Sequence, residues 1–507
     1  MTNNLLLWIG AFGSYLHSSQ SFHTSNKYTT QSHTRKLGKF ITNYHALTYP
    51  PHQVQLQHQR VKRSAYTEDP EKSQKFVEIK FQGKDRNFHL KLAPDTKTFT
   101  KDADLGGVKT DHIYYGHLHG EQESSSVHGA IINGVFQQGQ IHTQNGTYYV
   151  DHIKEHLDGK VTSPIFHSVI YHQDDIDFNF NNSQNSSTCG HSHNNLRQPP
   201  LDWLQTPPHD EIEDAVRSKR VRRQVDTRRT TCVLRIEVDY MLFKHYGDKE
   251  EVLQMIASHV RALSEIYRTS KFELRNSGQT FQGINFQVKR VIINDQDNSG
   301  SKFYNKHIGV ERFLELASEG DYDSFCLAYV FTKRDFDNGV LGLAWVAQPR
   351  QSVGGICEKH RRIPGSGAKS MNTGIITIEN YGNTVPSRVS HVTFAHEVGH
   401  NFGSPHDSGK LCTPGESGKS VAERNQGNYI MYARATSGLK PNNRIFSPCS
   451  LRNISAVLEV KSHCFKESDA PICGNGIVDE GEECDCGFES DCLDLGDNCC
   501  TEKLLRL

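Results

Sequence analysis

The sequence has no long apolar run, almost no net charge and a low hydrophobic content. No stretch approaches the roughly 18 apolar residues that a membrane-spanning helix needs, so we expect no membrane span in this chain. The formal net charge is -1 at pH 7, which gives no reason to expect a nucleic-acid partner. A length of 507 residues predicts about three domains. The hydrophobic content of 35% is low for one compact globule, so we expect a large polar segment.

Cysteine is absent from the first part of the chain until Cys189, which lies in a polar run rich in Asn and Ser. An even number of cysteines in a secreted chain favours disulfides over metal thiolates, although spacing alone leaves the pairing open. The next six cysteines meet this condition: Cys232, Cys326, Cys357, Cys412, Cys449 and Cys464.

A short apolar run from Leu5 to Leu16 lies near the N-terminus and is followed by small and polar residues. It predicts a signal peptide over 1–18, although no Lys or Arg precedes it, and a buried N-terminal strand is the alternative. The sequence therefore predicts passage through the secretory pathway. Acceptor patterns for N-linked glycosylation, which suit exposed loops of a lumenal protein, occur at Asn145, Asn181, Asn185 and Asn453.

Residues 393–407 have the sequence T-F-A-H-E-V-G-H-N-F-G-S-P-H-D and are the most informative stretch of the chain. His396 and His400 are four residues apart, so on a helix both side chains project from one face and can bind one metal ion. Glu397 lies beside the ligand face, where we expect it to stay unligated as the general base. The alternative is a helix that carries surface histidines.

The end of this predicted helix supplies a third imidazole. Gly403 can take the positive φ that ends a helix and reverses the chain, and Pro405 prevents the helix from resuming. His406 can then return as the third ligand. Three neutral imidazoles hold a zinc ion and leave its fourth position open to water, which is the arrangement of a catalytic zinc site.

Residues 70–175 are predicted to be β-rich. Apolar and polar residues alternate over 77–81 and 88–92, which is the period of half-buried strands. Asn133-Gly134 and Asn145-Gly146 predict hairpin turns.

From Cys232 onward the pattern changes to alternating strands and helices, which predicts a twisted, mainly parallel sheet with crossover helices. The apolar segment 340–345 is expected to be an edge strand above the site helix, where Gly342 would let an extended substrate approach closely. A buried strand is the alternative there. The other strands are expected at 233–238, 286–293 and 325–331, and the helices at 250–267 and 309–318.

Two basic clusters, Arg60 to Arg63 and Arg220 to Arg223, match the pattern that a furin-like convertase cleaves. We expect cleavage after Arg63 and after Arg223, with a solvated linker as the alternative. Cys189, upstream of the second cluster, is a candidate ligand for the open zinc position. A bound thiolate there would keep the precursor inactive. A free thiol or an intermolecular disulfide is the alternative for this residue.

Composition changes after residue 467, where cysteines become dense and apolar residues few. Disulfides rather than a core are expected to hold 468–507 together. Oxygen ligands cluster there as a candidate calcium site, with a solvated acidic turn as the alternative: Asn475, Asp479, Glu482 and Asp485.

The zinc motif, with Asp407 directly after the third histidine, resembles the ADAM (adamalysin) branch of the metzincin proteases. The segments G-I-I-T-I-E-N-Y-G at 374–382 and G-N-Y-I-M-Y-A-R-A-T-S-G at 427–438 are similar to its Kuzbanian-type, alpha-secretase-like subgroup. The resemblance covers most of residues 40–500. It implies that Met431 belongs to a turn that packs beneath the zinc ligands.

The same resemblance implies a signal peptide over 1–18, a prodomain over 19–223, a metzincin protease domain over 224–467 and the start of a disintegrin domain over 468–507. Because the final residues T-E-K-L-L-R-L do not continue the family pattern, we expect the chain to stop inside this last domain. The implied disulfide pairs are Cys232 with Cys326, Cys357 with Cys464, and Cys412 with Cys449.

These features predict a zinc metalloendopeptidase, made as a zymogen, that cuts the juxtamembrane stalks of membrane proteins. The resemblance implies Notch-like receptors, amyloid-precursor-like proteins and membrane-bound ligands as substrates. Full-length members are type I proteins of the cell surface, whereas this truncated chain is expected to be secreted or lumenal. The alternative is a non-catalytic adhesion protein, which the intact set of histidines with Glu397 and the absence of R-G-D disfavour.

Overall fold

The computed structural model describes residues 37, 40–64, 75–83, 86–122, 124–156, 166–177, 225–275, 278–349, 354–363 and 365–467. In this part of the chain no helix has the length and apolar character needed to cross a membrane. The predicted signal peptide and disintegrin segment lie outside the described residues. So do these predicted site residues: Asn181, Asn185, Cys189, Arg223, Asn475, Asp479, Glu482 and Asp485.

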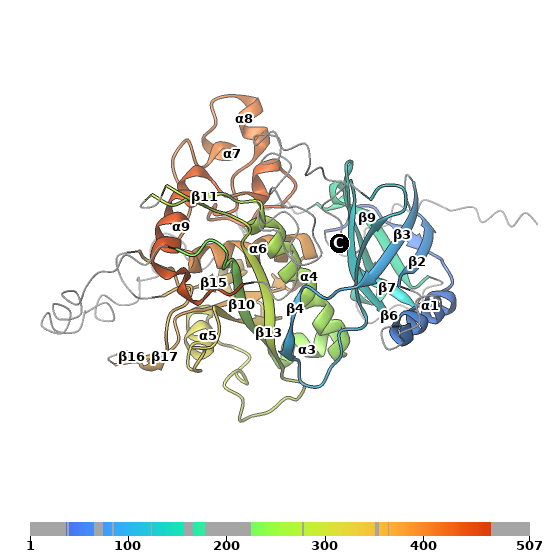
Figure 1. The fold of residues 1–507 in the computed structure, drawn as a ribbon, viewed down its shortest axis with the longest axis horizontal. Coiled ribbons are helices and arrows are strands. Elements are labelled where there is room, and N and C mark those ends of the chain that lie inside the picture. The colour runs from blue at the N-terminus through green and yellow to red at the C-terminus, as the bar shows by residue number, and fades with distance from the viewer. Residues whose placement is uncertain are drawn as a thin grey trace, which may run out of the picture. The chain divides into compact units, whose positions relative to one another are not determined.

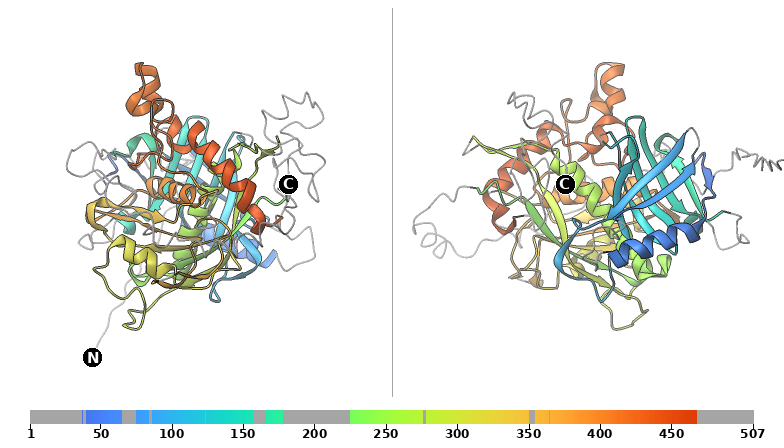
Figure 2. Two further views of the ribbon diagram at one scale, coloured as in Figure 1. Left: turned by 90° about the vertical axis from the view of Figure 1, so that its left-hand side faces the viewer. Right: turned by 45° about the vertical axis from the view of Figure 1, so that its right-hand side comes forward.

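The N-terminal region is built on an eight-stranded antiparallel sheet in the order β1-β9-β8-β7-β6-β5-β3-β2. Helix α1 (Pro51–Ser64), which the sequence pattern did not predict, packs against β2 and β6, and Figure 2 shows it in dark blue beside these strands. The predicted β-rich region is confirmed. The strands are β1 (His45–Leu47), β2 (Val77–Gln82), β3 (Asn87–Pro94), β5 (Ile113–Leu118), β6 (Ser126–Ile132), β7 (Val135–Thr143), β8 (Gly146–His152) and β9 (Ser168–His172).

Two tight turns join β6, β7 and β8. Asn133 and Gly134 have φ values of 52° and 78°, the left-handed conformation that this hairpin turn requires, as the sequence predicts. The second turn differs from the prediction by one residue. Because Thr143 pairs with Gly146, the turn consists of Gln144 and Asn145, and Gly146 already belongs to β8.

The second region is α/β and contains a six-stranded sheet in the order β15-β18-β14-β10-β13-β4. All neighbours pair in parallel except β15, which runs antiparallel to β18 at one end, so the predicted mainly parallel sheet is confirmed. Its own strands are β10 (Thr231–Val238), β13 (Asn285–Ile293), β14 (Leu327–Thr332), β15 (Gly342–Ala344) and β18 (Thr373–Thr377), and its main helices are α3 (Tyr240–Tyr246), α4 (Lys249–Arg268), α5 (Val310–Ala317), α6 (Ser387–Asn401) and α9 (Pro448–Lys461).

Helix α4 illustrates how the sequence forms the helices that cover the α/β sheet. Asp248 caps its first turn by accepting hydrogen bonds from the backbone N–H groups of Glu250 and Glu251. The residues at helical spacing on its apolar face, from Val252 to Tyr267, are buried against the sheet and α6. Short elements complete the region: β11 (Phe272–Glu273), β12 (Thr280–Phe281), β16 (Arg361–Ile363), β17 (Gly367–Lys369), β19 (Glu379–Asn380), β20 (Asn383–Thr384), α7 (Pro414–Ser417) and α8 (Val421–Gln426).

Strand β4 (Phe99–Asp104) comes from the N-terminal region of the sequence but pairs in parallel with β13 of the α/β sheet, as Figure 1 shows. The backbone N–H of Val288 donates to the carbonyl of Thr98 at 2.9 Å. Two ion pairs follow the same register, Lys289 with Asp102 at 2.9 Å and Arg290 with Asp104 at 3.2 Å. The two regions are therefore joined by a shared sheet.

Three disulfides lie in the α/β region. A disulfide restricts the unfolded chain, and each of these closes a long loop of sequence, so together they stabilise the region that carries the candidate site. They join the same partners as the pairs that the family resemblance implies: Cys232 to Cys326, Cys357 to Cys464, and Cys412 to Cys449.

Candidate active site

Helix α6 carries the H-E-x-x-H motif and is buried along almost its whole length. Phe394 and Val398 are fully buried on the side that packs against the sheet core. The ligand side is buried as well, with His396 at 6% and His400 at 1% exposure. The helix therefore lies between the core and other parts of the chain, so it is not the half-exposed helix that an amphipathic pattern would suggest.

The three predicted ligands come together. One ring nitrogen from each of His396, His400 and His406 lies within 4.8 Å of the other two. The ring centroids are 4.8 to 5.3 Å apart. This is a compact set of three nitrogen donors of the kind that zinc prefers.

Backbone carbonyls fix the orientation of two of these rings. Nδ1 of His396 lies 2.7 Å from the carbonyl oxygen of Ile430, and Nδ1 of His400 lies 2.7 Å from that of Ser404. A carbonyl can only accept, so in both rings Nδ1 carries the proton and Nε2 keeps its lone pair. The donor set therefore fits a zinc ion bound through Nε2, with the outer nitrogen anchored by the protein.

The turn after α6 requires glycine at 403. Gly403 has φ of 97°, and a Cβ atom there would lie 2.3 Å from Cγ2 of Val457. Its N–H donates to the carbonyl of His400, and the N–H of Ser404 donates to that of Gly399, both at 2.9 Å. These bonds end the helix and direct the chain back toward the two helical histidines.

Met431 lies beneath the ligands. A Cβ atom on Gly399, between the two helical histidines, would lie 2.4 Å from Sδ of Met431, so the methionine side chain packs directly against the helix backbone at this glycine. The Met431 carbonyl accepts from the N–H of Asp407 at 2.8 Å, which ties the segment after His406 to the same turn.

The sequence that forms this site is similar to those of known proteins. Residues 249–460 match the Metallo-peptidase family M12B, Reprolysin-like. Disintegrin and metalloproteinase domain-containing protein 10 of Homo sapiens is 46% identical in an alignment of 480 residues that covers 92% of this chain and 62% of that protein. The chain belongs to the ADAM family of metalloproteases.

Two other relatives extend the comparison. The disintegrin and metalloproteinase domain-containing protein 10 homolog of Caenorhabditis elegans is 36% identical over 544 residues, covering 93% of this chain and 57% of that protein. The zinc metalloproteinase-disintegrin-like atragin of Naja atra is 25% identical over 423 residues, covering 81% and 57%. The chain thus spans about three fifths of the length of the ADAM relatives it matches.

Glu397 is fully buried next to the ligands, and Gly342 makes room for it. A Cβ atom on Gly342 would lie 2.5 Å from Cγ of Glu397 and 2.6 Å from its Oε1. We expected this glycine to admit the substrate. In the structure its lack of a side chain accommodates the candidate base. Strand β15, which contains Gly342, lies at the end of the sheet as predicted, but it is three residues long and buried.

Asp407, the residue typical of the ADAM branch, is held by α9. Its carboxylate accepts from the hydroxyls of Ser447 and Ser450, the latter at 2.8 Å. Burial raises the pKa of Asp407 to about 6, although the two hydroxyl bonds work in the opposite direction. Sequence reasoning missed both serines, but Ser447 also caps α9, and S-P-x-S before an apolar run is a cap pattern.

The remaining predicted site residues with described positions are separate from this site. Asn145 is exposed in the β7–β8 turn, and Asn453 is half-buried on α9. Arg63 is exposed in the last turn of α1. A convertase needs an extended segment, so the end of α1 would have to unwind before cleavage after Arg63.

Proposed function

We propose that this chain is a zinc-dependent metalloendopeptidase that is made as a latent precursor. The observation that carries the proposal is the convergence of three imidazoles, two with their outer nitrogens bonded to carbonyls, beside the buried carboxylate of Glu397. Membership of the ADAM family supports the same chemistry.

His396, His400 and His406 would hold the zinc, which supplies a Lewis acid that polarises the scissile carbonyl and acidifies water. Glu397 accepts the proton from the attacking water and returns it to the leaving amine. The carbonyls of Ile430 and Ser404 keep the His396 and His400 rings in place throughout.

The proposed substrates are flexible juxtamembrane stalks of membrane proteins. Strand β15 lies at the end of the sheet and contacts α6, so an extended peptide paired along it would be directed toward the histidines. Notch-like receptors, amyloid-precursor-like proteins and membrane-bound ligands are proposed from the ADAM resemblance. The secretory pathway and the cell surface are the proposed location.

Latency is proposed to come from residues 19–223 acting as a prodomain, with 224–467 as the protease domain and 468–507 as part of a disintegrin domain. The N-terminal region contacts the site helix directly, because Gln140 of β7 donates to Nδ1 of His391 at 2.9 Å. A furin-like convertase acting at Arg223, and at Arg63, would separate the regions. Cys189 as the zinc ligand of the precursor and calcium at 475–485 remain parts of this proposal.

A peptidase assay tests the proposal. The purified chain, treated with a convertase, is mixed with a fluorogenic peptide that has the sequence of an unstructured stalk. We expect cleavage that a zinc chelator abolishes and added Zn²⁺ restores. Absence of cleavage by the processed chain with zinc bound would favour the alternative, an adhesion protein. The untreated chain and an Arg223→Ala variant are the latent controls.

A further inference from the structure

A second group of metal-binding side chains lies away from the catalytic histidines. In the described ranges, four groups bring three His, Cys, Asp or Glu donor atoms within 4.8 Å of one another. Two of these groups contain cysteines that are bonded in disulfides, and a third is the catalytic trio. The fourth consists of His128, His142 and Glu265.

The strand register explains why the two histidines share one face. His128 of β6 pairs with Gln140 of β7, and His142 lies two residues further along β7. Residues two apart on a strand point to the same side. Both imidazoles therefore lie on the face of the sheet that carries Gln140, and this face is turned toward the α/β region. That face packs against α4, whose last turn contains Glu265.

His128 is a deeply buried donor. It is 3% exposed, and its Nε2 atom has no hydrogen-bond partner among the described residues. A buried polar nitrogen without a partner costs free energy, so natural structures usually pair such an atom with a protein group, a water or a metal ion. In the tautomer that carries its proton on Nδ1, this nitrogen offers a lone pair to a cation at the interface.

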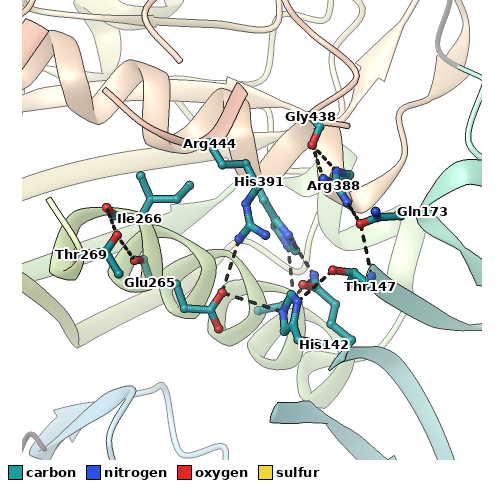
Figure 3. Close-up of polar contacts among 12 residues, drawn as sticks. His142, Thr147, Gln173, Glu265, Ile266, Thr269, Arg388, His391, Gly438 and Arg444 are labelled. Atoms are coloured by element: carbon teal, nitrogen blue, oxygen red, sulfur yellow. Dashed lines mark hydrogen bonds and ion pairs between the residues drawn. The ribbon is translucent and has the colours of Figure 1, made fainter. Parts of the chain in front are cut away.

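His142 is oriented by a second contact. Its Nδ1 lies 2.9 Å from the hydroxyl of Thr147, and its Nε2 lies 3.8 Å from Oε2 of Glu265, as Figure 3 shows. A separation of 3.8 Å is too long for a hydrogen bond. A metal ion on Nε2 requires the ring proton on Nδ1, and the Thr147 hydroxyl can accept it there, which is the arrangement that a metal-binding histidine adopts.

Glu265 completes the group from the other region. Its Oε2 atom is the carboxylate oxygen that faces Nε2 of His142. Arg444 Nη2 lies 3.4 Å from the same oxygen. The side chains of His142 and Glu265 are 20% and 31% exposed overall, whereas the Nε2 atoms of His128 and His142 are buried, so the donor nitrogens are shielded from bulk solvent.

We propose that His128, His142 and Glu265 form a second zinc site, which links the N-terminal region to helix α4. A ligand set of two imidazoles and one carboxylate favours zinc over calcium or magnesium. Bonds of about 2.0 to 2.2 Å require the donors to approach one another by roughly 1 Å. The partly exposed side chains of His142 and Glu265 can make this movement.

The division of the ligands gives the site its role. The two histidines belong to the region proposed to be removed, and the carboxylate belongs to the region that remains. Zinc therefore binds the joined state and not the separated one, so by linkage it stabilises the joined precursor. Bound zinc therefore holds the two regions together and keeps the precursor inactive.

Metal analysis of the intact chain tests this proposal. We expect two zinc equivalents per wild-type chain, one in His142→Ala, one in His406→Ala and none in the double variant. His89→Ala is the matched control, because His89 is a histidine of the same sheet that pairs with Glu78 instead, and it should retain both equivalents. One equivalent in the wild type and none in His406→Ala would refute the second zinc site and would still agree with zinc at the catalytic histidines.

A second variant and a stability measurement distinguish loss of the metal site from misfolding of the His142→Ala variant. Glu265→Gln keeps the shape of the side chain and should also lose one equivalent, with unchanged circular dichroism. Zn²⁺ added to metal-stripped chain that carries His406→Ala should raise the unfolding temperature, and it should not do so once Glu265→Gln is added. Equal shifts in both would show that the bound zinc lies elsewhere.

Discussion

Arg388, near the start of the site helix, donates a hydrogen bond through Nη1 to the side-chain carbonyl of Gln173 in the N-terminal region, 2.8 Å away. Figure 3 shows the guanidinium between Gln173 and the carbonyl of Gly438. Arg388 is 7% exposed, so this charge has left water and depends on protein acceptors. The N-terminal region therefore satisfies part of a buried charge on α6.

Gln173→Ala should loosen the precursor. A hydrogen bond to a charged group contributes about 1.5 to 3 kcal/mol, so we expect the free energy of unfolding to fall by this amount. Urea unfolding of the precursor measures it. Gln144→Ala, in the exposed β7–β8 turn, is the control with the same chemical change. Equal stability of the two variants would show that Arg388 does not depend on Gln173.

Glu397→Ala should separate metal binding from catalysis. We expect the processed enzyme to keep its catalytic zinc and to lose activity by about 100- to 10,000-fold, the usual contribution of a general base. Stalk-peptide cleavage and metal content measure the two effects, with the exposed Glu311→Ala as control. Wild-type turnover in Glu397→Ala would refute the assignment.

Gly342→Ala should impair the enzyme through Glu397. The new methyl group would lie 2.5 Å from Cγ of Glu397, so either the carboxylate or the strand must move. Overpacking of this kind costs about 1 to 3 kcal/mol of stability, and displacement of the base should lower kcat more than it raises KM. Ala344→Gly, on the same strand, adds no atoms and should keep kcat. An unchanged kcat in Gly342→Ala would mean that the contact is not maintained during turnover.

Acid should destabilise the precursor through two buried histidines. The rings of His259 and His391 pack 4.4 Å apart between α4 and α6, near His128, His142 and Arg444. Burial lowers the pKa of His259 to about 4, and burial together with the neighbouring His259 lowers that of His391 well below its usual value. The unfolded chain binds protons near pH 6.5, so stability is full above that pH and falls as the pH drops toward 4.

For His259 alone the expected loss at pH 5.5 is about 1 to 2 kcal/mol. Urea unfolding at pH 7.5 and 5.5 measures it. In His259→Gln the difference between the two pH values should shrink by that amount, whatever the variant does to stability itself. An identical difference in the two proteins would contradict the assignment.

The local parts of the molecule were predictable from the sequence. Spacing alone indicated that His396 and His400 share a helix face, and helical periodicity located α4 to within one residue at each end. Both patterns depend on neighbours within a few turns, where sequence distance and spatial distance agree.

Long-range contacts were not predictable. Strand β4 has no alternating pattern, and its partner β13 lies far away in the sequence. The contact of Gly342 with Glu397 depends on how β15 crosses α6. The same holds for Asp407 with Ser450 and for His142 with Glu265. In each pair only the folded chain brings the partners together, so composition and spacing carry no trace of them.

The position of β4 also bears on how the molecule is assembled. A nascent chain exposes β4 before any other strand of the sheet that it joins, because synthesis runs from the N-terminus. The backbone groups along β4 are then a template on which β13 can register when it appears. The proposed maturation would therefore withdraw a strand from a continuous sheet. A protease domain produced without residues 99–104 would have to form the sheet at β13 without this neighbouring strand.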